Sequence, residues 1–224
     1  KKGVEPSIAK KTMENSSKGK SIKKEDVKKK KKKNVPNWYI ESCQKIKYMF
    51  PKAHAVAYVM MAFRIAYCKV HFPLAFYAAY FTVRATEFDA HLIVKGPQVL
   101  RQQLKELELK GNNVSAKEKG LQTVFELALE MFLRGFTFEK VDLNNSTADK
   151  FIMLNNSLLP PLASLQGLGT SAAINIVQAR EEKEFSSIED LKVRARLSKT
   201  VIDILQEHGC LNGMMESDQM NLFA

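Results

Sequence analysis

Hydrophobic positions recur at helical spacing through the middle of the chain. Leucines stand at positions 100, 104 and 107 of residues 97–109, and apolar side chains follow a similar spacing in residues 116–134. This spacing lines up one face of a helix, so both segments are predicted to be core-facing helices joined by a turn at residues 111–113. Two shorter helices are predicted at residues 37–47 and 74–81.

The period shortens after residue 135. Residues 136–143 and 151–154 are rich in closely spaced aromatic and aliphatic side chains and flank a polar turn at residues 142–147. Such a pattern is typical of short strands. The expected fold class is therefore mainly α with a small β element.

A long alanine-rich apolar run, residues 49–66, opens with Phe50-Pro51-Lys52-Ala53-His54. Proline favours a helix start, and the unpaired N–H groups and positive dipole end there favour an anion. Lys52 and His54 fall in that first turn, and Tyr58 lies over His54 at i+4. Two interpretations stay open: a phosphate-binding site, or a buried helix whose histidine and tyrosine belong to the core. A break at His71-Phe72-Pro73 then ends the helical run.

The strongest local signal lies in residues 162–177. Gly167 and Gly169 flank Leu168, and an alanine-rich helix is predicted to begin near Ser171. In a helix-hairpin-helix, glycines with φ > 0 bring bare backbone N–H groups against a phosphate, while the leucine fills the turn. An ordinary helix-turn-helix corner is the alternative. The residues expected to contact DNA here are Gly167, Leu168, Gly169, Thr170 and Ser171.

A second, degenerate pair of helices follows. Ser186 and Glu189 form a predicted capping box, and residues 198–208, closed by Gly209, form a predicted helix. The segment joining the two helices has no G-x-G and instead carries Arg196 and Lys199. These two cations are expected to touch phosphate, a contact that positions a duplex without reading its sequence.

The net charge of +11 is concentrated at the start of the 224-residue chain. Residues 1–34 carry +10 and residues 35–84 carry +5, whereas residues 85–163 carry −1 and residues 164–224 carry −3. DNA binding by the last third must therefore rest on peptide dipoles. The lysines at 28–33 repel one another, which favours a solvated or disordered segment; an arm that follows phosphates and is sensitive to salt is the alternative.

Length and composition, with 45% hydrophobic and 26% charged residues, fit two modest globular domains. Cys43, Cys68 and Cys210 have neither disulfide nor zinc-site spacing, and neither a signal peptide nor a membrane span is predicted. A reducing cytoplasm is expected. The chain begins with Lys1 rather than methionine, so a fragment or processed product is also expected.

The chain ends in Gln219-Met220-Asn221-Leu222-Phe223. A leucine and a phenylalanine buried in a pocket contribute roughly 1.5–3 kcal/mol each. The pattern predicts either docking into a partner or folding back onto the chain's own core. Near the other end, Trp38 is expected to anchor a small apolar face of the helix at residues 37–47.

Several of these stretches together resemble a known family, the C-terminal end of the α subunit of PolC-type bacterial DNA polymerase III. The resemblance covers nearly the whole chain from Val35. It rests on Val35-Pro36-x-Trp38-Tyr39-Ile40, on residues 45–54, on residues 80–85, on Gly167-Leu168-Gly169 and on the Gln-x-x-Leu-Phe ending. Residues 1–34 match only loosely.

The resemblance implies a division of the chain by role. Residues 1–34 would be a lysine-rich, possibly disordered part of the fingers domain and residues 35–80 the end of that domain. Residues 81–212 would form the duplex-binding domain, with the helix-hairpin-helix at about 162–211, and residues 213–224 a flexible tail.

It also implies partners for the site residues. Lys52 and His54 would contact the phosphates of the incoming deoxynucleoside triphosphate, Tyr58 would line its pocket, and Gln219-Met220-Asn221-Leu222-Phe223 would bind the sliding clamp. Primer-template duplex DNA and other replisome subunits are further partners, at a cytoplasmic replisome and not at a membrane.

The catalytic magnesium of such polymerases is held by palm carboxylates that lie upstream in the family. Phosphoryl transfer by two metals needs those carboxylates, so the resemblance implies that this chain alone binds no metal and is inactive. The alternative is a non-enzymatic, clamp-tethered DNA-binding module of a repair protein, which would have no use for the Lys52 and His54 helix.

Overall fold

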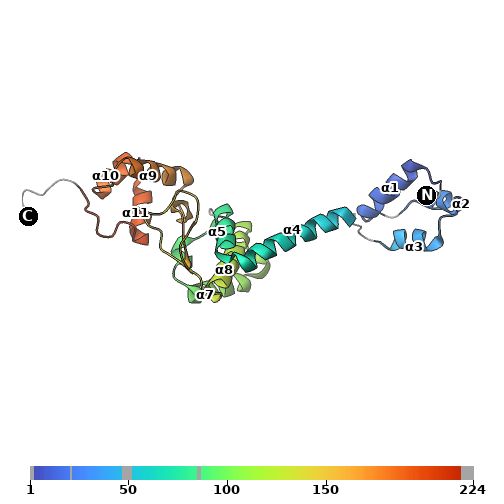
Figure 1. Cartoon of the computed structure of the whole chain (residues 1–224), viewed down its shortest axis with the longest axis horizontal. Coiled ribbons are helices and arrows are strands. Elements are labelled where there is room, and N and C mark those ends of the chain that lie inside the picture. Colours follow the sequence, from blue (N-terminus) through green and yellow to red (C-terminus); the bar gives the residue numbers. More distant parts are fainter. Residues whose placement is uncertain (1–2, 21, 47–51, 85–86, 218–224) are drawn as a thin grey trace, which may run out of the picture. The chain divides into compact units, whose positions relative to one another are not determined.

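The structure is a computed structural model that describes residues 3–20, 22–46, 52–84 and 87–217. The chain divides into two compact units, Lys1–Arg64 and Ile65–Ala224, and each is described by itself. Most of the described residues are helical, and a three-stranded sheet completes the fold (Figure 1). The predicted fold class is thereby confirmed. The division by role at residue 80 stays a prediction.

The N-terminal unit contains three short helices followed by most of a long one. They are α1 (Pro6–Ser17), α2 (Lys24–Lys32), α3 (Asn37–Lys45) and α4 (Lys52–His71), of which residues 52–64 belong to this unit. The helices α1 and α2 both pack against α3, and the buried apolar side chains between them include Ile8, Ile22 and Ile40.

The lysine run at 28–33, for which a solvated or disordered segment was predicted, instead forms the end of α2. Acidic residues occupy the first turn of this helix and lysines its last turn, an arrangement that matches the helix dipole. Lys30 points inward, is buried, and donates to Thr12 Oγ1 at 2.5 Å. One lysine of the run therefore holds α2 to α1, which a pattern of like charges does not reveal.

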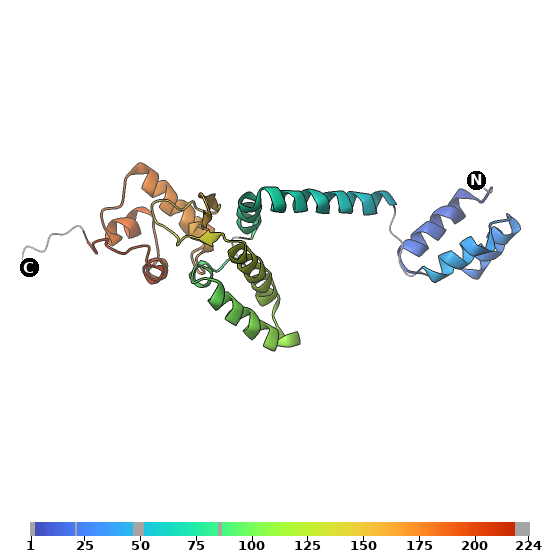
Figure 2. The ribbon, with the colours of Figure 1, turned by 60° about the horizontal axis from the view of Figure 1, so that its bottom comes forward.

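The C-terminal unit begins within α4 and contains the remaining elements. Its helices are α5 (Pro73–Val83), α6 (Ala90–Ile93), α7 (Pro97–Leu109), η2 (Gly111–Asn113), α8 (Ala116–Leu133), η3 (Leu162–Ser164), α9 (Thr170–Glu182), α10 (Ile188–Arg194) and α11 (Lys199–His208). The helices predicted at 74–81, 97–109, 116–134 and 198–208 are confirmed to within a few residues. In Figure 2, α7 and α8 lie side by side, in agreement with their extensive packing.

The sheet is smaller than predicted and includes one unpredicted strand. It has the order β1-β3-β2, where β1 is Thr137–Phe138, β2 is Ile152–Met153 and β3 is Ser157–Leu159. Parallel pairing joins β1 to β3, and antiparallel pairing joins β2 to β3. The turn at 142–147 is confirmed, since Asp142 Oδ1 accepts from the backbone N–H groups of Asn144 and Asn145.

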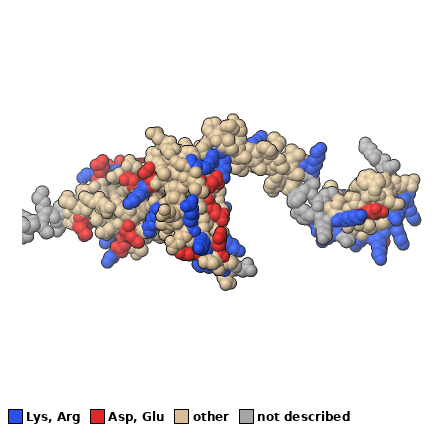
Figure 3. Space-filling view, turned by 90° about the horizontal axis from the view of Figure 1, so that it is seen from below, with Lys and Arg blue, Asp and Glu red and all other residues tan. Residues whose placement is uncertain are grey.

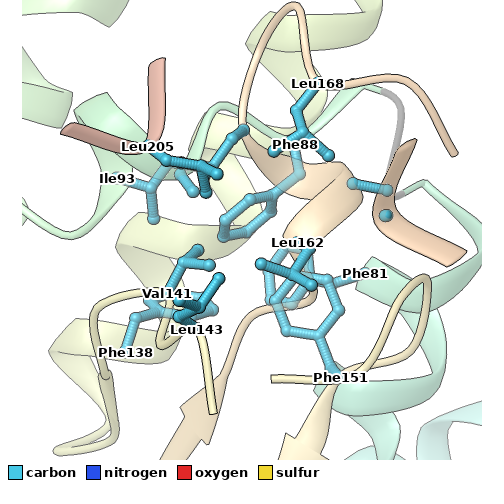
Figure 4. Packing of buried hydrophobic residues seen from close by; sticks show 14 of the residues in the cluster. Phe81, Phe88, Ile93, Phe138, Val141, Leu143, Phe151, Leu162, Leu168 and Leu205 are labelled. Atoms are coloured by element: carbon cyan, nitrogen blue, oxygen red, sulfur yellow. The ribbon is translucent and has the colours of Figure 1, made fainter. Parts of the chain in front are cut away.

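The core of the C-terminal unit is centred on aromatic rings from distant parts of the chain (Figure 4). The ring of Phe88 lies 5.3 Å from those of Phe81 and Phe138 and 4.8 Å from that of Phe151, measured between centroids. In Figure 4, Leu168 lies on the opposite side of Phe88 from these last rings. The aromatic cluster therefore lies next to the predicted helix-hairpin-helix turn, which contains Leu168.

The predicted break before Pro73 is confirmed, because α4 ends at His71, α5 begins at Pro73 and the two helices are bent by 119°. Within the described residues, no single helix is long and apolar enough to cross a bilayer; α4 and α5 meet that test only when taken together as this bent pair.

A polar network closes the end of α4 against α5 and α8. Glu130 accepts from Lys69 Nζ at 2.6 Å and from Tyr77 Oη at 2.9 Å. Arg134 donates to the carbonyl oxygen of Lys69 with two nitrogens, both at 3.1 Å, so it satisfies an otherwise open carbonyl at the helix end. The last turns of α4 are thereby fixed to the core of the C-terminal unit.

Candidate nucleic-acid interface

The first hairpin joins η3 to α9 through Gly167, Leu168 and Gly169. Gly167 has φ of 91°, and a Cβ at this position would lie 2.8 Å from Ile204 Cδ1. Glycine is thus favoured at position 167 by the left-handed backbone conformation, and a Cβ there would also displace the flexible end of the Ile204 side chain. Leu168 is 2% exposed, which confirms that it fills the turn.

The second glycine acts differently from the prediction. Gly169 has φ of −65° and ψ of 155° and serves as the N-cap of α9, so the expectation of φ > 0 at both glycines is wrong. Among the described residues, α9 has no side-chain cap and a Cβ at Gly169 would meet no atom within 4 Å. Its first N–H groups are therefore available to an anion that approaches the exposed surface at Thr170 and Ser171.

The second hairpin joins α10 to α11 with the same backbone path. Arg196 has φ of 53°, Leu197 is 7% exposed, and Ser198 is the N-cap of α11 with φ of −72° and ψ of 159°. Unlike Gly169, Ser198 caps its own helix, since its Oγ accepts from the N–H of Val201 at 3.3 Å. This hairpin is therefore a genuine counterpart of the first, but it offers a cation in place of bare backbone.

The N-cap of helix α10 lies one residue later than the predicted capping box places it. Ser187, and not Ser186, is its N-cap and accepts from the N–H of Asp190 at 3.1 Å. Ser187 also forms a β-bridge with Met215, and the N–H of Ile188 donates to the carbonyl of Met215 at 2.9 Å. This pairing with a later part of the chain decides which of the two adjacent serines becomes the cap.

Two arginines that sequence reasoning passed over bind backbone carbonyls: Arg194 joins α10 to the end of α9, and Arg180 joins α9 to the turn at 142–147. Arg194 donates to the carbonyl oxygens of Ala179 and Lys183, at the end of α9, and pairs with Asp190 at 3.1 Å. Arg180 donates to the carbonyl oxygens of Leu143 and Ser146 at 2.6 and 3.0 Å. Both side chains are engaged with backbone, so they position the hairpins. The only sequence signal was an arginine near the end of each helix.

Arg196 and Lys199 remain as the cations at the second hairpin. Both are exposed, and neither forms an ion pair within the part of the chain that the structure describes. They lie immediately beside Leu197 and the N-terminus of α11. Arg196 therefore takes the position of Gly167, and Lys199, the first residue of α11, takes that of Thr170, the first residue of α9.

A cavity of about 300 Å³ lies between the hairpins and α6, and its lining includes Asp89, His91, Gln166, Glu207 and His208. The carboxylates of Asp89 and Glu207 make it unsuitable for a phosphate. His208 is buried, and its Nε2 accepts from the N–H of Val141 at 3.1 Å. Burial, together with smaller electrostatic effects of His91, Lys140 and Lys95, lowers the pKa of His208 to about 4. His208 therefore joins α11 to the β region as a neutral acceptor.

The predicted nucleotide-facing residues lie at the start of α4. Lys52 is the first residue of the helix, and the rings of His54 and Tyr58 are in edge contact with centroids 4.6 Å apart. None of the described side chains of α4 is buried, and Tyr58 is 67% exposed. The alternative of a core helix is therefore not supported within this chain. Phe50 and Pro51 lie outside the described residues, and so does Gln219-Met220-Asn221-Leu222-Phe223, the segment predicted to bind the sliding clamp.

Comparison with known proteins supports both the helix-hairpin-helix assignment and the resemblance of the whole chain to PolC-type DNA polymerase III. A family model described as "Helix-hairpin-helix motif" matches residues 135–220. Over 222 residues, or 99% of the chain, the sequence is 57% identical to the DNA polymerase III PolC-type of Oceanobacillus iheyensis and 56% identical to that of Halalkalibacterium halodurans. It is 55% identical over 221 residues to that of Bacillus subtilis.

The paired hairpins and their family match define residues 135–220 as a helix-hairpin-helix module, a class of DNA-binding structure. The whole chain, in turn, is homologous to a segment of PolC-type DNA polymerase III, and the resemblance found from the sequence is confirmed. The chain spans only 16% of the length of the Oceanobacillus relative and 15% of the Bacillus relative.

Proposed function

We propose that this chain is the part of a replicative DNA-directed DNA polymerase that holds duplex DNA by its backbone and presents a helix to the incoming nucleotide. The observation that carries the proposal is the pair of hairpins, each with a left-handed residue, a buried leucine and a helix N-terminus. The homology to PolC-type DNA polymerase III supports the same conclusion.

Duplex binding by the first hairpin rests on backbone N–H groups at the start of α9. Gly169→Val tests this directly, because φ of −65° and the open space around Gly169 accommodate a side chain in the free protein. We expect duplex affinity to fall roughly tenfold, since hydrogen bonds to a charged group contribute about 1.5–3 kcal/mol. Fluorescence anisotropy of the intact protein with two duplexes of unrelated sequence measures it. A loss confined to one sequence would contradict backbone recognition.

Charge at the second hairpin provides a matched pair of variants. Lys199→Ala removes a cation at the N-terminus of α11, whereas Lys192→Ala removes an equally exposed lysine from α10. We expect only the first change to weaken duplex binding and to reduce the slope of log K against log salt concentration, by about 1. Equal effects of the two variants would mean that only overall charge matters.

Nucleotide binding is proposed for Lys52, His54 and Tyr58 on α4. In the intact polymerase, Lys52→Ala and His54→Ala should raise the KM for deoxynucleoside triphosphates or lower kcat. Arg64→Ala, an exposed cation farther along the same helix, is the control and should leave both constants unchanged. Unchanged kinetics in all variants would favour the alternative, a non-enzymatic clamp-tethered module of a repair protein.

The remaining parts of the proposal concern partners outside the chain. Gln219-Met220-Asn221-Leu222-Phe223 is proposed to bind the sliding clamp, and deletion of residues 219–224 should abolish clamp-stimulated processivity while distributive synthesis persists. Magnesium is proposed to be held by carboxylates of the longer polymerase, so this chain by itself should be inactive. Other replisome subunits and a cytoplasmic location follow from the same assignment.

A further inference from the structure

The N-terminal unit exposes its tryptophan, Trp38, to solvent. Trp38 is 69% exposed and Tyr39 is 44% exposed, and their rings meet edge to face with centroids 5.9 Å apart. The expectation that Trp38 anchors an apolar face is therefore wrong: Ile40 and Cys43 form the buried face of α3. Tryptophan is on average highly buried, so the exposure of Trp38 suggests that it contacts a ligand.

The surface around Trp38 is a shallow depression on one face of α3. It has a volume of about 410 Å³ and is lined by Trp38, Glu41, Ser42, Lys45 and Ile46. These residues follow one another at helical spacing, so an aromatic ring and the amine of Lys45 face the same space. Glu41 is the single acidic residue in this lining.

The neighbouring helix α2, which packs against α3, supplies more positive charge. Of the lysines in its last turn only Lys30 is buried. The exposed lysines in and next to this helix are Lys23, Lys24, Lys28, Lys29, Lys31, Lys32 and Lys33. Figure 3 views this unit from the side on which α3 lies in Figure 1, and shows many basic atoms with little acidic surface between them.

An exposed aromatic pair on α3, together with exposed lysines on the helix that packs against α3, matches a ligand that is both a polyanion and a source of flat rings. Single-stranded nucleic acid has both properties, because its bases are free to stack while its phosphates follow the cations. In a duplex the bases are already stacked and paired, so Trp38 could reach only the backbone. An acidic protein would satisfy the lysines but gives no reason for an accessible tryptophan.

We propose that α2 and α3 form a binding site for single-stranded nucleic acid, in which bases stack on Trp38 and Tyr39 and phosphates contact Lys45 and the exposed lysines of α2. The site lies in a different unit from the hairpins and uses a different chemistry. It goes beyond the proposed duplex and nucleotide contacts and does not depend on them, so failure of one leaves the other standing.

Trp38 is the single tryptophan of the chain, which makes its own fluorescence a probe of this site. The chain is titrated with a thirty-nucleotide oligo-dT at low salt, and with heparin as a polyanion without bases. We expect strong quenching of Trp38 by oligo-dT and little by heparin. Absence of quenching by oligo-dT, or equal quenching by both, would overturn the proposal and leave an acidic protein as the better ligand.

Variants separate stacking from charge, with affinity measured by anisotropy of labelled oligo-dT. Trp38→Ala should weaken binding roughly 5- to 100-fold, the range expected for one stacked base, whereas Trp38→Phe should retain most of the affinity. Exposure of Trp38 means that neither change removes a core side chain. Unaltered affinity in Trp38→Ala would contradict a stacking platform.

The lysines are tested as a group with a control of equal charge. Changing Lys28, Lys29, Lys31 and Lys32 to Gln should reduce the slope of log K against log salt by about 3, because single strands release roughly 0.7 counterions per neutralised phosphate. The control changes Lys105, Lys117, Lys119 and Lys192, all exposed in the C-terminal unit. An equal reduction in both sets would mean that the α2 lysines form no site.

Discussion

At the first hairpin the residue in the left-handed region is Gly167, with φ of 91°, and at the second hairpin it is Arg196, with φ of 53°. Each is followed by a buried leucine and then by the N-cap of a helix, Gly169 in one case and Ser198 in the other. The backbone path is shared although the residue types differ. The shape of the turn therefore depends on the buried leucine and on the N-cap position. Glycine occupies the left-handed position only in the first hairpin, where Ile204 approaches closely.

The chemical consequence is a division of labour between the two turns. The first presents the uncapped N-terminus of α9, while the second satisfies part of its own N-terminus through Ser198 and presents Arg196 and Lys199. Dipoles bind phosphate with no net charge, and cations bind it with a strong dependence on salt. The comparison predicts that the two turns respond differently to substitution.

The largest expected effect is on the leucines that the turns share. Leu168→Ala and Leu197→Ala should each lower the free energy of unfolding by roughly 2–5 kcal/mol. Leu168 should lie at the upper end, since it is 2% exposed and faces the cluster around Phe88, whereas Leu197 is 7% exposed (Figure 4). Urea unfolding followed by circular dichroism measures both. A cost below about 1 kcal/mol for Leu197→Ala would break the equivalence of the two hairpins.

Lowering the pH should destabilise helix α11 of the second hairpin, because this helix ends in the buried His208. The folded pKa of His208, about 4 because of burial, lies below the unfolded value near 6.5. The stability that the neutral ring contributes is therefore present above pH 6.5 and is lost as the pH falls toward 4, by on the order of 2 kcal/mol. His208→Gln should remove this part of the pH dependence. His71→Gln, at an exposed histidine, should leave it unchanged.

The two glycines of the first hairpin should differ sharply. Gly167→Ala combines φ of 91° with a Cβ 2.8 Å from Ile204 Cδ1, so a cost of about 1–3 kcal/mol is expected. Gly169→Ala, at φ of −65° with open space around it, should change stability by no more than about 0.5 kcal/mol, because lost capping and reduced unfolded-state entropy nearly offset each other. Equal costs in thermal unfolding would show that neither the left-handed backbone at residue 167 nor the approach of Ile204 disfavours a side chain there.

A small gain in stability is expected from a glycine at position 196. Arg196→Gly relieves a side chain held at φ of 53° and should stabilise the fold by no more than about 1 kcal/mol. The same change should weaken duplex binding and lower its salt dependence by about 1. Arg196→Lys keeps both the charge and the strained backbone, so it should alter neither property. Opposite signs for stability and binding are the signature of a residue kept for its charge.

The fold was predictable wherever a signal is local. Helical spacing gave α7 and α8, and Gly209 was correctly placed as the residue that closes α11, with φ of 90°. The capping position before α10 was wrong by one residue, because pairing with Met215, far along the chain, selects Ser187. The strand β3 was missed because its three residues are all buried and show no alternation, and because one of its two partners, β1, lies on the other side of the polar turn.

The candidate site, like the fold, was predictable where the signal is local and not where it depends on distant parts of the chain. A glycine, a leucine and a second glycine in sequence were sufficient to locate the first hairpin, and the cations of the second were identified by their position between two predicted helices. The sequence did not reveal that Gly169 adopts a negative φ as an N-cap, that Arg180 and Arg194 are bound to backbone carbonyls, or that Trp38 is exposed.

The sequence by itself determined the helices α5, α7, α8 and α11, the breaks at Pro73 and Gly209, and the leucine that fills the first turn, because period, caps and allowed φ values act over a few residues. Tertiary structure alone decided the inward turn of Lys30, the network around Glu130, the neutral state of His208 and the exposure of Trp38. Each of these depends on which distant groups remove or leave water around a side chain. Desolvation and long-range pairing are properties of the folded surface, and no local pattern encodes them.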